Sequence, residues 1–231
     1  MAASTLVLAI DVGVRNLAMA LVDVDRRRGK LMRIVAIELV DLTALRHRRV
    51  PRHRCALPHS AEMCDRIAHL VQEYDDEWFA RADGGILIER QPLAGLKSVE
   101  QLLLATFRDR AELVHPCAVH AWARVAHQTY DERKRSAVAR IDALLAAREA
   151  IADAAVRERW RAMVRAHDVA DALMLVLYKL APLRDAHRQA KRMRAPPPPT
   201  PSRSGIVAIR SVAALLETYR YVAPDATREG D

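Results

Sequence analysis

Four acidic residues stand where an apolar segment of the chain ends or begins. Two of them follow short apolar runs of strand character, and two open the long apolar run at 167–180 with a spacing of three, which puts both on one helical face. Carboxylates gathered in this way are the ligands that hard divalent ions such as Mg²⁺ prefer. Two such ions about 3.5–4 Å apart can clamp the attacking and leaving oxygens of a phosphoryl transfer. The four residues are Asp11, Glu89, Asp168 and Asp171.

Each acid also has a purely structural explanation. Asp11 could cap a turn, and Glu89 with Arg90 could be an ordinary charge pair at a strand end. Asp168 and Asp171 would complement the dipole of a helix that begins there. Because all four stand beside a suitable element, the set favours a metal-dependent active site over four independent coincidences.

The apolar periodicity predicts the elements that would position these acids. Ser60 is a candidate helix N-cap, and Ser98 with Gln101 has the spacing of a capping box. The predicted order is three strands, helix, strand, helix, strand, helices, which indicates an α/β fold with a mixed five-stranded sheet flanked by helices. The strands are predicted at 5–10, 17–24, 33–42, 84–90 and 117–122, and the helices from Ser60, from Ser98, over 131–154 and over 168–180.

The charge of the chain favours a polyanionic partner. Its 37 Lys and Arg against 29 Asp and Glu give a formal net charge of +8, and the excess is mostly arginine, which suits bidentate phosphate contacts. Arginines cluster at 26–30 and 46–54, although a GC-rich genome would also enrich this residue. The candidate contacts to nucleic acid in these clusters are Arg27, Arg28, Arg48 and Arg49.

Other features bound the class of protein. The three cysteines lack paired spacing, and the histidines at 115, 120, 127 and 167 are scattered, so neither a disulfide framework nor a zinc or histidine metal site is expected. No signal peptide or bilayer-spanning run is evident, which predicts a soluble, intracellular protein. The proline-rich, basic composition after residue 182 predicts one folded domain over 1–182 and a tail over 183–231, with a short helix possible at 206–220.

Four segments together resemble the Holliday-junction resolvases of the RuvC type, and most closely their poxviral and mitochondrial branch. They are LAIDVGVRNLAMALVD, GGILIERQP, DERKRSAVARI and HDVADALMLVLYKL, and the resemblance covers residues 6 to about 180. It implies a ribonuclease H-like fold, a homodimer, dependence on Mg²⁺ or Mn²⁺, and symmetric nicking of four-way DNA junctions to leave 5′-phosphate and 3′-hydroxyl ends. By motif, it makes Asp11, Glu89, Asp168 and Asp171 the metal-binding acids. Localisation in a viral, mitochondrial or nuclear setting is left open.

The resemblance also implies a basic residue near the scissile phosphate, on the helix before the last acids. Lys134 fits this position best and Arg135 second, with a solvated helix charge as the alternative. Gly13 would give the backbone beside Asp11 room to approach a phosphate. Arg15 and Asn16 could donate to phosphate oxygens, or Asn16 could instead tie down the turn.

Other functions remain open at this stage. The same acids would serve another ribonuclease H-like nuclease that cuts RNA–DNA hybrids or flapped DNA. An ATP-binding protein of the actin and sugar-kinase type also opens with an Asp-x-Gly turn, but it needs a second lobe and glycine-rich loops, and this chain has 7 glycines. A catalytically inactive DNA-binding subunit is disfavoured because all four acids are present.

Overall fold

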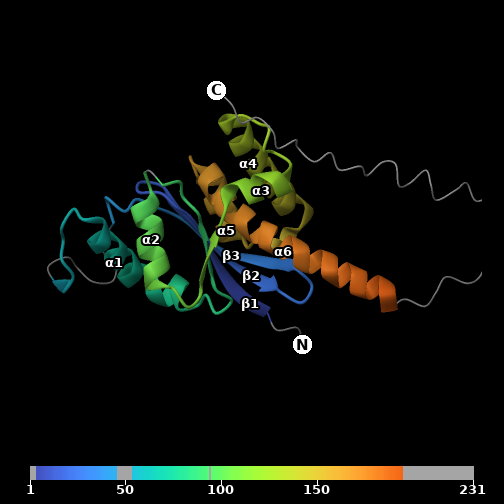
Figure 1. Cartoon of the computed structure of the whole chain (residues 1–231), viewed down its shortest axis with the longest axis horizontal. Helices are drawn as coiled ribbons and strands as arrows, with labels where there is room; N and C mark the ends of the chain where they lie inside the picture. The colour runs from blue at the N-terminus through green and yellow to red at the C-terminus, as the bar shows by residue number, and fades with distance from the viewer. Residues whose placement is uncertain (1–3, 46–53, 94, 195–231) are drawn as a thin grey trace, which may run out of the picture. The chain divides into compact units, whose positions relative to one another are not determined.

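Five strands form one mixed sheet in the order β3-β2-β1-β4-β5 (Figure 1). The computed structural model describes residues 4–45, 54–93 and 95–194. The first three strands form an antiparallel meander, whereas β4 and β5 run parallel to β1. The predicted mixed five-stranded sheet is thereby confirmed. The strands are β1 Ser4–Asp11, β2 Leu17–Asp25, β3 Lys30–Val40, β4 Ile86–Glu89 and β5 Ala111–Val114.

Strand β1 lies at the centre of the sheet and is covered on both faces. Its alternate residues enter two separate cores: Leu8 and Ile10 belong to one, Val7 and Ala9 to the other. A strand that is buried on both faces needs a continuous apolar run rather than an alternating one, which explains its sequence. The same alternation puts Asp11, the last residue of β1, on the face of Val7 and Ala9.

Helices cover both faces of the sheet, so the predicted α/β class is confirmed (Figure 1). Residues of α1, α2 and a π-helical turn (η2) join the core of Leu8 and Ile10. Residues of α3, α4, α5, α6 and a 3₁₀ turn (η3) join the core of Val7 and Ala9. Their bounds are α1 Met63–Tyr74, η2 Asp75–Phe79, α2 Lys97–Thr106, α3 Pro116–Ala123, α4 Tyr130–Ala147, η3 Glu149–Ile151, α5 Ala154–Ala162 and α6 Ala166–Arg194.

The segment 117–122 was predicted as a strand and is a helix instead, so this prediction is wrong. The last strand is β5, which lies inside the stretch expected to be helical after Ser98. Pro116 occupies the first helical turn of α3, and the His115 Nδ1 accepts a hydrogen bond of 3.2 Å from the Cys117 amide. A proline at that position favours a helix start, and this local signal outweighs the apolar character of the segment.

The two helix caps predicted from serines are also wrong. Helix α2 begins at Lys97 after Leu96, with no side-chain cap, and α1 begins after Glu62. The Ser60 hydroxyl instead accepts a hydrogen bond of 3.0 Å from the Glu62 amide, in the turn that precedes the helix. A capping box does occur at the start of α4, between Thr129 and Glu132.

Helix α6 continues well past its predicted end at Leu180. It runs to Arg194 and contains Pro182, whose ring removes one backbone hydrogen bond without ending the helix. The expected domain boundary at 182/183 stays a prediction, and the predicted helix at 206–220 lies outside the described residues. Within the described part of the chain, no helix is both long and apolar enough to cross a membrane.

Candidate active site

Asp11 and Glu89 lie side by side because two parallel strands end together. The register pairs Ile10 of β1 with Ile88 of β4, so the next residue of each strand is an acid at the same edge of the sheet. Asp11 is only 8% exposed. Both carboxylates therefore project from one edge toward the face that α3, α4 and α6 cover.

A tight turn leads from Asp11 into β2. A Cβ at Gly13 would lie 2.5 Å from the Asn16 carbonyl oxygen, so this position has no room for any side chain. The Leu42 amide donates a hydrogen bond of 2.8 Å to the Val14 carbonyl, which fixes the turn to the end of the β3 segment. The backbone of the turn thus fills the space that a side chain would take, and Gly13 itself lines the cavity beside Asp11, so the expected approach of this backbone to a phosphate stays a prediction.

The other two acids lie at the start of α6 and are held by Lys134 of α4. The Lys134 ammonium is 3.2 Å from Asp168 Oδ1 and 2.5 Å from Asp171 Oδ2. Arg165 donates through Nε to the other Asp168 oxygen at 2.7 Å. Asp168 is buried and Asp171 is partly exposed. The spacing of three along α6 places both carboxylates on the face that meets α4.

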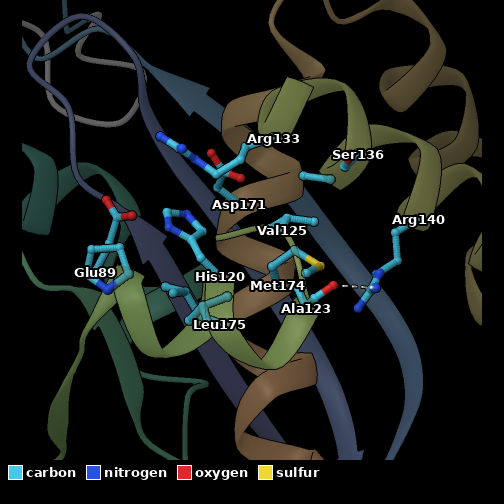
Figure 2. A pocket seen from close by; sticks show the side chains of 13 residues that line it. Glu89, His120, Ala123, Val125, Arg133, Ser136, Arg140, Asp171, Met174 and Leu175 are labelled. Carbon is cyan, nitrogen blue, oxygen red and sulfur yellow. Dashed lines mark hydrogen bonds between the residues drawn. The ribbon is translucent and has the colours of Figure 1, made fainter. Parts of the chain in front are cut away.

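One open cavity of about 370 Å³ brings these groups together. All four acids line it, as do Lys134, Arg133 and Arg165 and the backbone of the turn after β1. A smaller, more apolar cavity of about 40 Å³ adjoins it and shares Glu89, His120, Arg133 and Asp171. Figure 2 shows the His120 ring between Glu89 and Asp171, with Met174 and Leu175 forming the apolar part of the smaller cavity.

Burial and close approach of the carboxylates decide the electrostatics of the larger cavity. Burial raises the pKa of Asp11 well above its ordinary value, and the neighbouring Glu89 carboxylate raises it further. Burial also raises the pKa of Asp171, although Lys134 opposes that shift. For Lys134, burial disfavours the charge, but the carboxylates of Asp171, Asp11 and Asp168 outweigh it and raise the pKa. The site therefore stabilises positive charge strongly.

The donor set fits a hard divalent cation. Four carboxylates converge on one cavity, and burial together with the neighbouring Glu89 raises the pKa of Asp11. Magnesium and manganese ions take oxygen ligands of this kind and keep several waters. The open cavity leaves room for those waters and for a phosphate group.

The other predicted site residues are not all at this cavity. Arg15 and Asn16 line it, whereas Arg135 is exposed on α4 and does not. Arg27 and Arg28 lie in the β2–β3 turn, at the opposite end of the sheet, because Asp25 pairs with Ser4 while Ala18 pairs with Asp11. At ~3.3 Å per residue, that separation is roughly 23 Å along the strand. Arg48 and Arg49 lie outside the described residues.

Three groups at the site, His120, Arg165 and Arg133, were not predicted from the sequence. His120 is one of several histidines that are scattered in the sequence; on α3 it lines the same cavity as the carboxylates. Burial lowers its pKa, and Arg133 lowers it further. Arg165 was not considered, although its position three residues before Asp168 is the spacing of a helix-start ion pair.

Glu100 is linked to the site through Gln91, and we expect loss of its carboxylate to destabilise the protein. It is fully buried, and its carboxylate accepts hydrogen bonds from the Gln91 amide at 2.5 Å, from Gln101 at 2.7 Å and from Lys97 at 2.6 Å. Gln91 in turn donates through its side chain to Glu89 at 2.7 Å. Replacing Glu100 by Gln should lower the free energy of unfolding by about 1.5–3 kcal/mol, since a hydrogen-bonded charge is lost.

The contribution of the Glu100 carboxylate to the free energy of unfolding should decrease at low pH. Burial alone would raise the Glu100 pKa, but the hydrogen bonds from Lys97, Gln91 and Gln101 lower it below the ordinary value of 4.5. Its contribution to stability is therefore complete above pH 4.5 and declines as the pH falls through the lowered pKa. Urea unfolding of wild type and Glu100→Gln at several pH values measures this. Equal stabilities of wild type and Glu100→Gln at neutral pH would contradict the prediction. Lys97→Met is the matched control, because it removes one hydrogen-bond donor and keeps the carboxylate.

Comparisons with known proteins agree with this architecture. The family model described as Poxvirus A22 protein matches residues 5–73. The yeast mitochondrial Holliday junction resolvase is similar at a TM-score of 0.55 and 16% identity, over 82% of this chain and 86% of that chain. Fowlpox virus resolvase, solved with Holliday junction DNA, gives 0.53 and 14%, over 78% of this chain and 99% of that chain. No curated protein matches. The chain therefore shares the fold of these two resolvases, and the family-model match over residues 5–73 supports the resemblance found in the sequence.

Proposed function

We propose that this chain is a metal-dependent endonuclease that resolves four-way DNA junctions by symmetric nicking. The observation that carries the proposal is the convergence of two strand-end acids and two α6 acids on one cavity that also holds Lys134. Similarity to two solved Holliday junction resolvases supports the choice of substrate. It also favours a nuclease over an ATP-binding protein of the actin and sugar-kinase type.

The charges in the cavity suggest a role for each residue. Asp11, Glu89, Asp168 and Asp171 would hold Mg²⁺ or Mn²⁺, in our proposal two ions, and bound metal would supply an activated water and charge neutralisation at the phosphate. Lys134 is held by Asp168 and Asp171 at the wall of the cavity, where its ammonium can contact a phosphate oxygen. Gln91 orients the Glu89 carboxylate through its hydrogen bond. The products would be a 5′-phosphate and a 3′-hydroxyl.

DNA contacts are proposed around the cavity first. Arg15 and Asn16 follow directly on the turn after Asp11 and line the same cavity, so they can reach the phosphates that flank the scissile bond. Arg133 and Arg165 add further positive charge there. Arg27 and Arg28, at the far end of the sheet, and Arg135, on the exposed side of α4, would contact only DNA arms that extend away from the cavity. Binding should weaken steeply with salt.

Symmetric nicking requires two active sites, which we propose are provided by a homodimer. A two-fold assembly would present identical cavities to the two opposed strands of a junction that is itself two-fold symmetric. Light scattering on the purified chain, alone and with a four-way junction, measures this directly. A strictly monomeric complex that still makes paired nicks would contradict the dimer.

A nicking assay on synthetic DNA tests the proposed function. In Mg²⁺, the full chain should introduce paired nicks into a four-way junction much faster than into linear duplex, flapped DNA or an RNA–DNA hybrid of the same sequence. The Asp168→Asn variant should be inactive, and Asp109→Asn, which changes an exposed acid outside the cavity, should behave as wild type. Faster cleavage of the hybrid or the flap would instead identify another ribonuclease H-like nuclease.

A further inference from the structure

A second cluster of ligand side chains lies on the other face of the sheet from the acids. Within the described residues, Cys55, His59 and His69 form the group whose potential ligand atoms all lie within 4.8 Å of one another. The His69 Nε2 and the His59 Nδ1 are 3.2 Å apart, and the two ring centroids are 4.6 Å apart. None of the three residues was expected to bind a metal from the sequence.

The three residues come from two segments that the fold brings together. Cys55 and His59 lie in the stretch that leads into α1, directly after the arginine-rich segment 46–54 of the sequence. His69 lies on α1 itself and is 6% exposed. Its neighbours Ile67 and Leu70 are buried in the core between α1 and the sheet, so His69 is held on a rigid element.

We propose that Cys55, His59 and His69 bind a zinc ion. Zinc takes nitrogen and sulfur ligands in tetrahedral geometry, with Zn–N bonds of about 2.0–2.1 Å and Zn–S bonds of about 2.3 Å. These bond lengths require two ligand nitrogens about 3.3 Å apart, close to the 3.2 Å between the two imidazoles. They place the sulfur about 3.6 Å from each nitrogen, and the three potential ligand atoms already lie within 4.8 Å of one another.

An open cavity borders the two histidines. Both histidines line a cavity of about 290 Å³, together with Thr43, Ser60 and Arg66. A water molecule can therefore complete the tetrahedron, as it does at zinc sites with three protein ligands. The nitrogen and sulfur donors distinguish this site from the acid-lined cavity, whose oxygen donors suit Mg²⁺.

Without zinc, the same side chains form a hydrogen-bonded cluster. The Cys55 thiol donates to the Gln72 side-chain oxygen at 3.2 Å, and one of the two imidazoles donates to the other. Zinc binding would release the thiol proton to solvent, and the donating imidazole would change to its other tautomer. The ion would then tie the stretch that follows the arginine-rich segment 46–54 to α1.

Cobalt spectroscopy on the full chain tests the site separately from nuclease activity. The purified protein should retain a single equivalent of zinc after desalting, and Co²⁺ exchanged into it should show a thiolate-to-cobalt charge-transfer band. The Cys55→Ser variant should lose the band, and Cys55→Ser and His59→Gln should each lower zinc affinity at least tenfold. The Cys64→Ser variant is the matched control, because Cys64 is exposed and lies outside the cluster.

The outcomes separate this proposal from the proposed function. A wild-type chain without zinc and without the cobalt band, or a band that persists in Cys55→Ser, overturns the zinc site and leaves only the hydrogen-bonded cluster. Neither result affects the assignment of the nuclease, because cobalt held by carboxylates gives no thiolate band. Circular dichroism of each variant confirms that a lost band reflects a lost ligand and not an unfolded chain.

Discussion

Asp11→Asn should abolish junction nicking while it makes the metal-free protein more stable. Activity should fall by 10²–10³-fold or more, roughly the cost of removing one group that stabilises charge in the transition state. In the folded protein, burial and Glu89 raise the Asp11 pKa, so its ionised form at neutral pH opposes folding. The isosteric amide removes that charge, and we expect a gain of about 0.5–2 kcal/mol, or roughly 2–4 °C in Tm per kcal/mol.

Nicking rates and thermal unfolding in EDTA measure the two effects on the same preparations. The gain in stability should shrink as the pH falls into the range where the Asp11 carboxyl is protonated in both states. Asp41→Asn is a control that should lower stability instead of raising it. Asp41 accepts hydrogen bonds from Thr43 that lower its pKa, so its ionised form favours folding. A loss of stability in Asp11→Asn would show that its carboxylate serves the fold, not a cation.

Lys134→Ala should reduce nicking on the order of 10²-fold and also destabilise the metal-free protein. The ammonium contacts both acids of α6, and its own side chain is 18% exposed. Without it, Asp168 and Asp171 face Asp11 and Glu89 with less compensating charge. We expect the free energy of unfolding to fall by about 1–3 kcal/mol in EDTA, which corresponds to the loss of charged hydrogen bonds in a partly exposed site.

Magnesium separates the two roles of Lys134. If the lysine contacts the phosphate, added Mg²⁺ should restore the stability of Lys134→Ala but not its nicking rate. Lys134→Arg, which keeps the charge, should retain more activity than Lys134→Ala. Arg108, which is exposed and outside the cavity, provides the matched control, and Arg108→Ala should change the rate little. A Lys134→Ala variant that nicks at the wild-type rate in Mg²⁺ would restrict the lysine to balancing charge in the metal-free protein.

The elements were predictable where a single physical signal dominates. Strand β1 is an uninterrupted apolar run with an acid at its end, and the meander through β3 has clear turn residues, so both could be predicted from sequence. The segment at 117–122 could not, because apolar residues of that length suit a strand or a buried helix equally. Only the proline at the first turn distinguishes them, and that signal was overlooked.

The four acids of the site could be predicted from the sequence, but the side chains that contact them could not. Strand ends and a helix start are visible in the sequence, so the four carboxylates could be named, and whether they bind metal stays a prediction. Contacts such as Arg165 to Asp168 and His120 to the carboxylates depend on which helix crosses which strand end. The cluster of Cys55, His59 and His69 was missed for the same reason, since His69 is separated from the others by a helix boundary.

The turn after Asp11 fixes the position of a glycine between β1 and β2. Since the Asn16 carbonyl fills the space of a side chain at position 13, the chain must place a glycine there and close the turn with the residues in between. If the turn kept its present geometry, insertion of one residue between Asp11 and Leu17 would shift every β2 side chain to the opposite face of the sheet. The glycine of the Asp-x-Gly motif is therefore required by the joining of two strands, whatever chemistry follows. Such a motif diagnoses a fold, and the acids of β4 and α6 must be found separately before it diagnoses a nuclease.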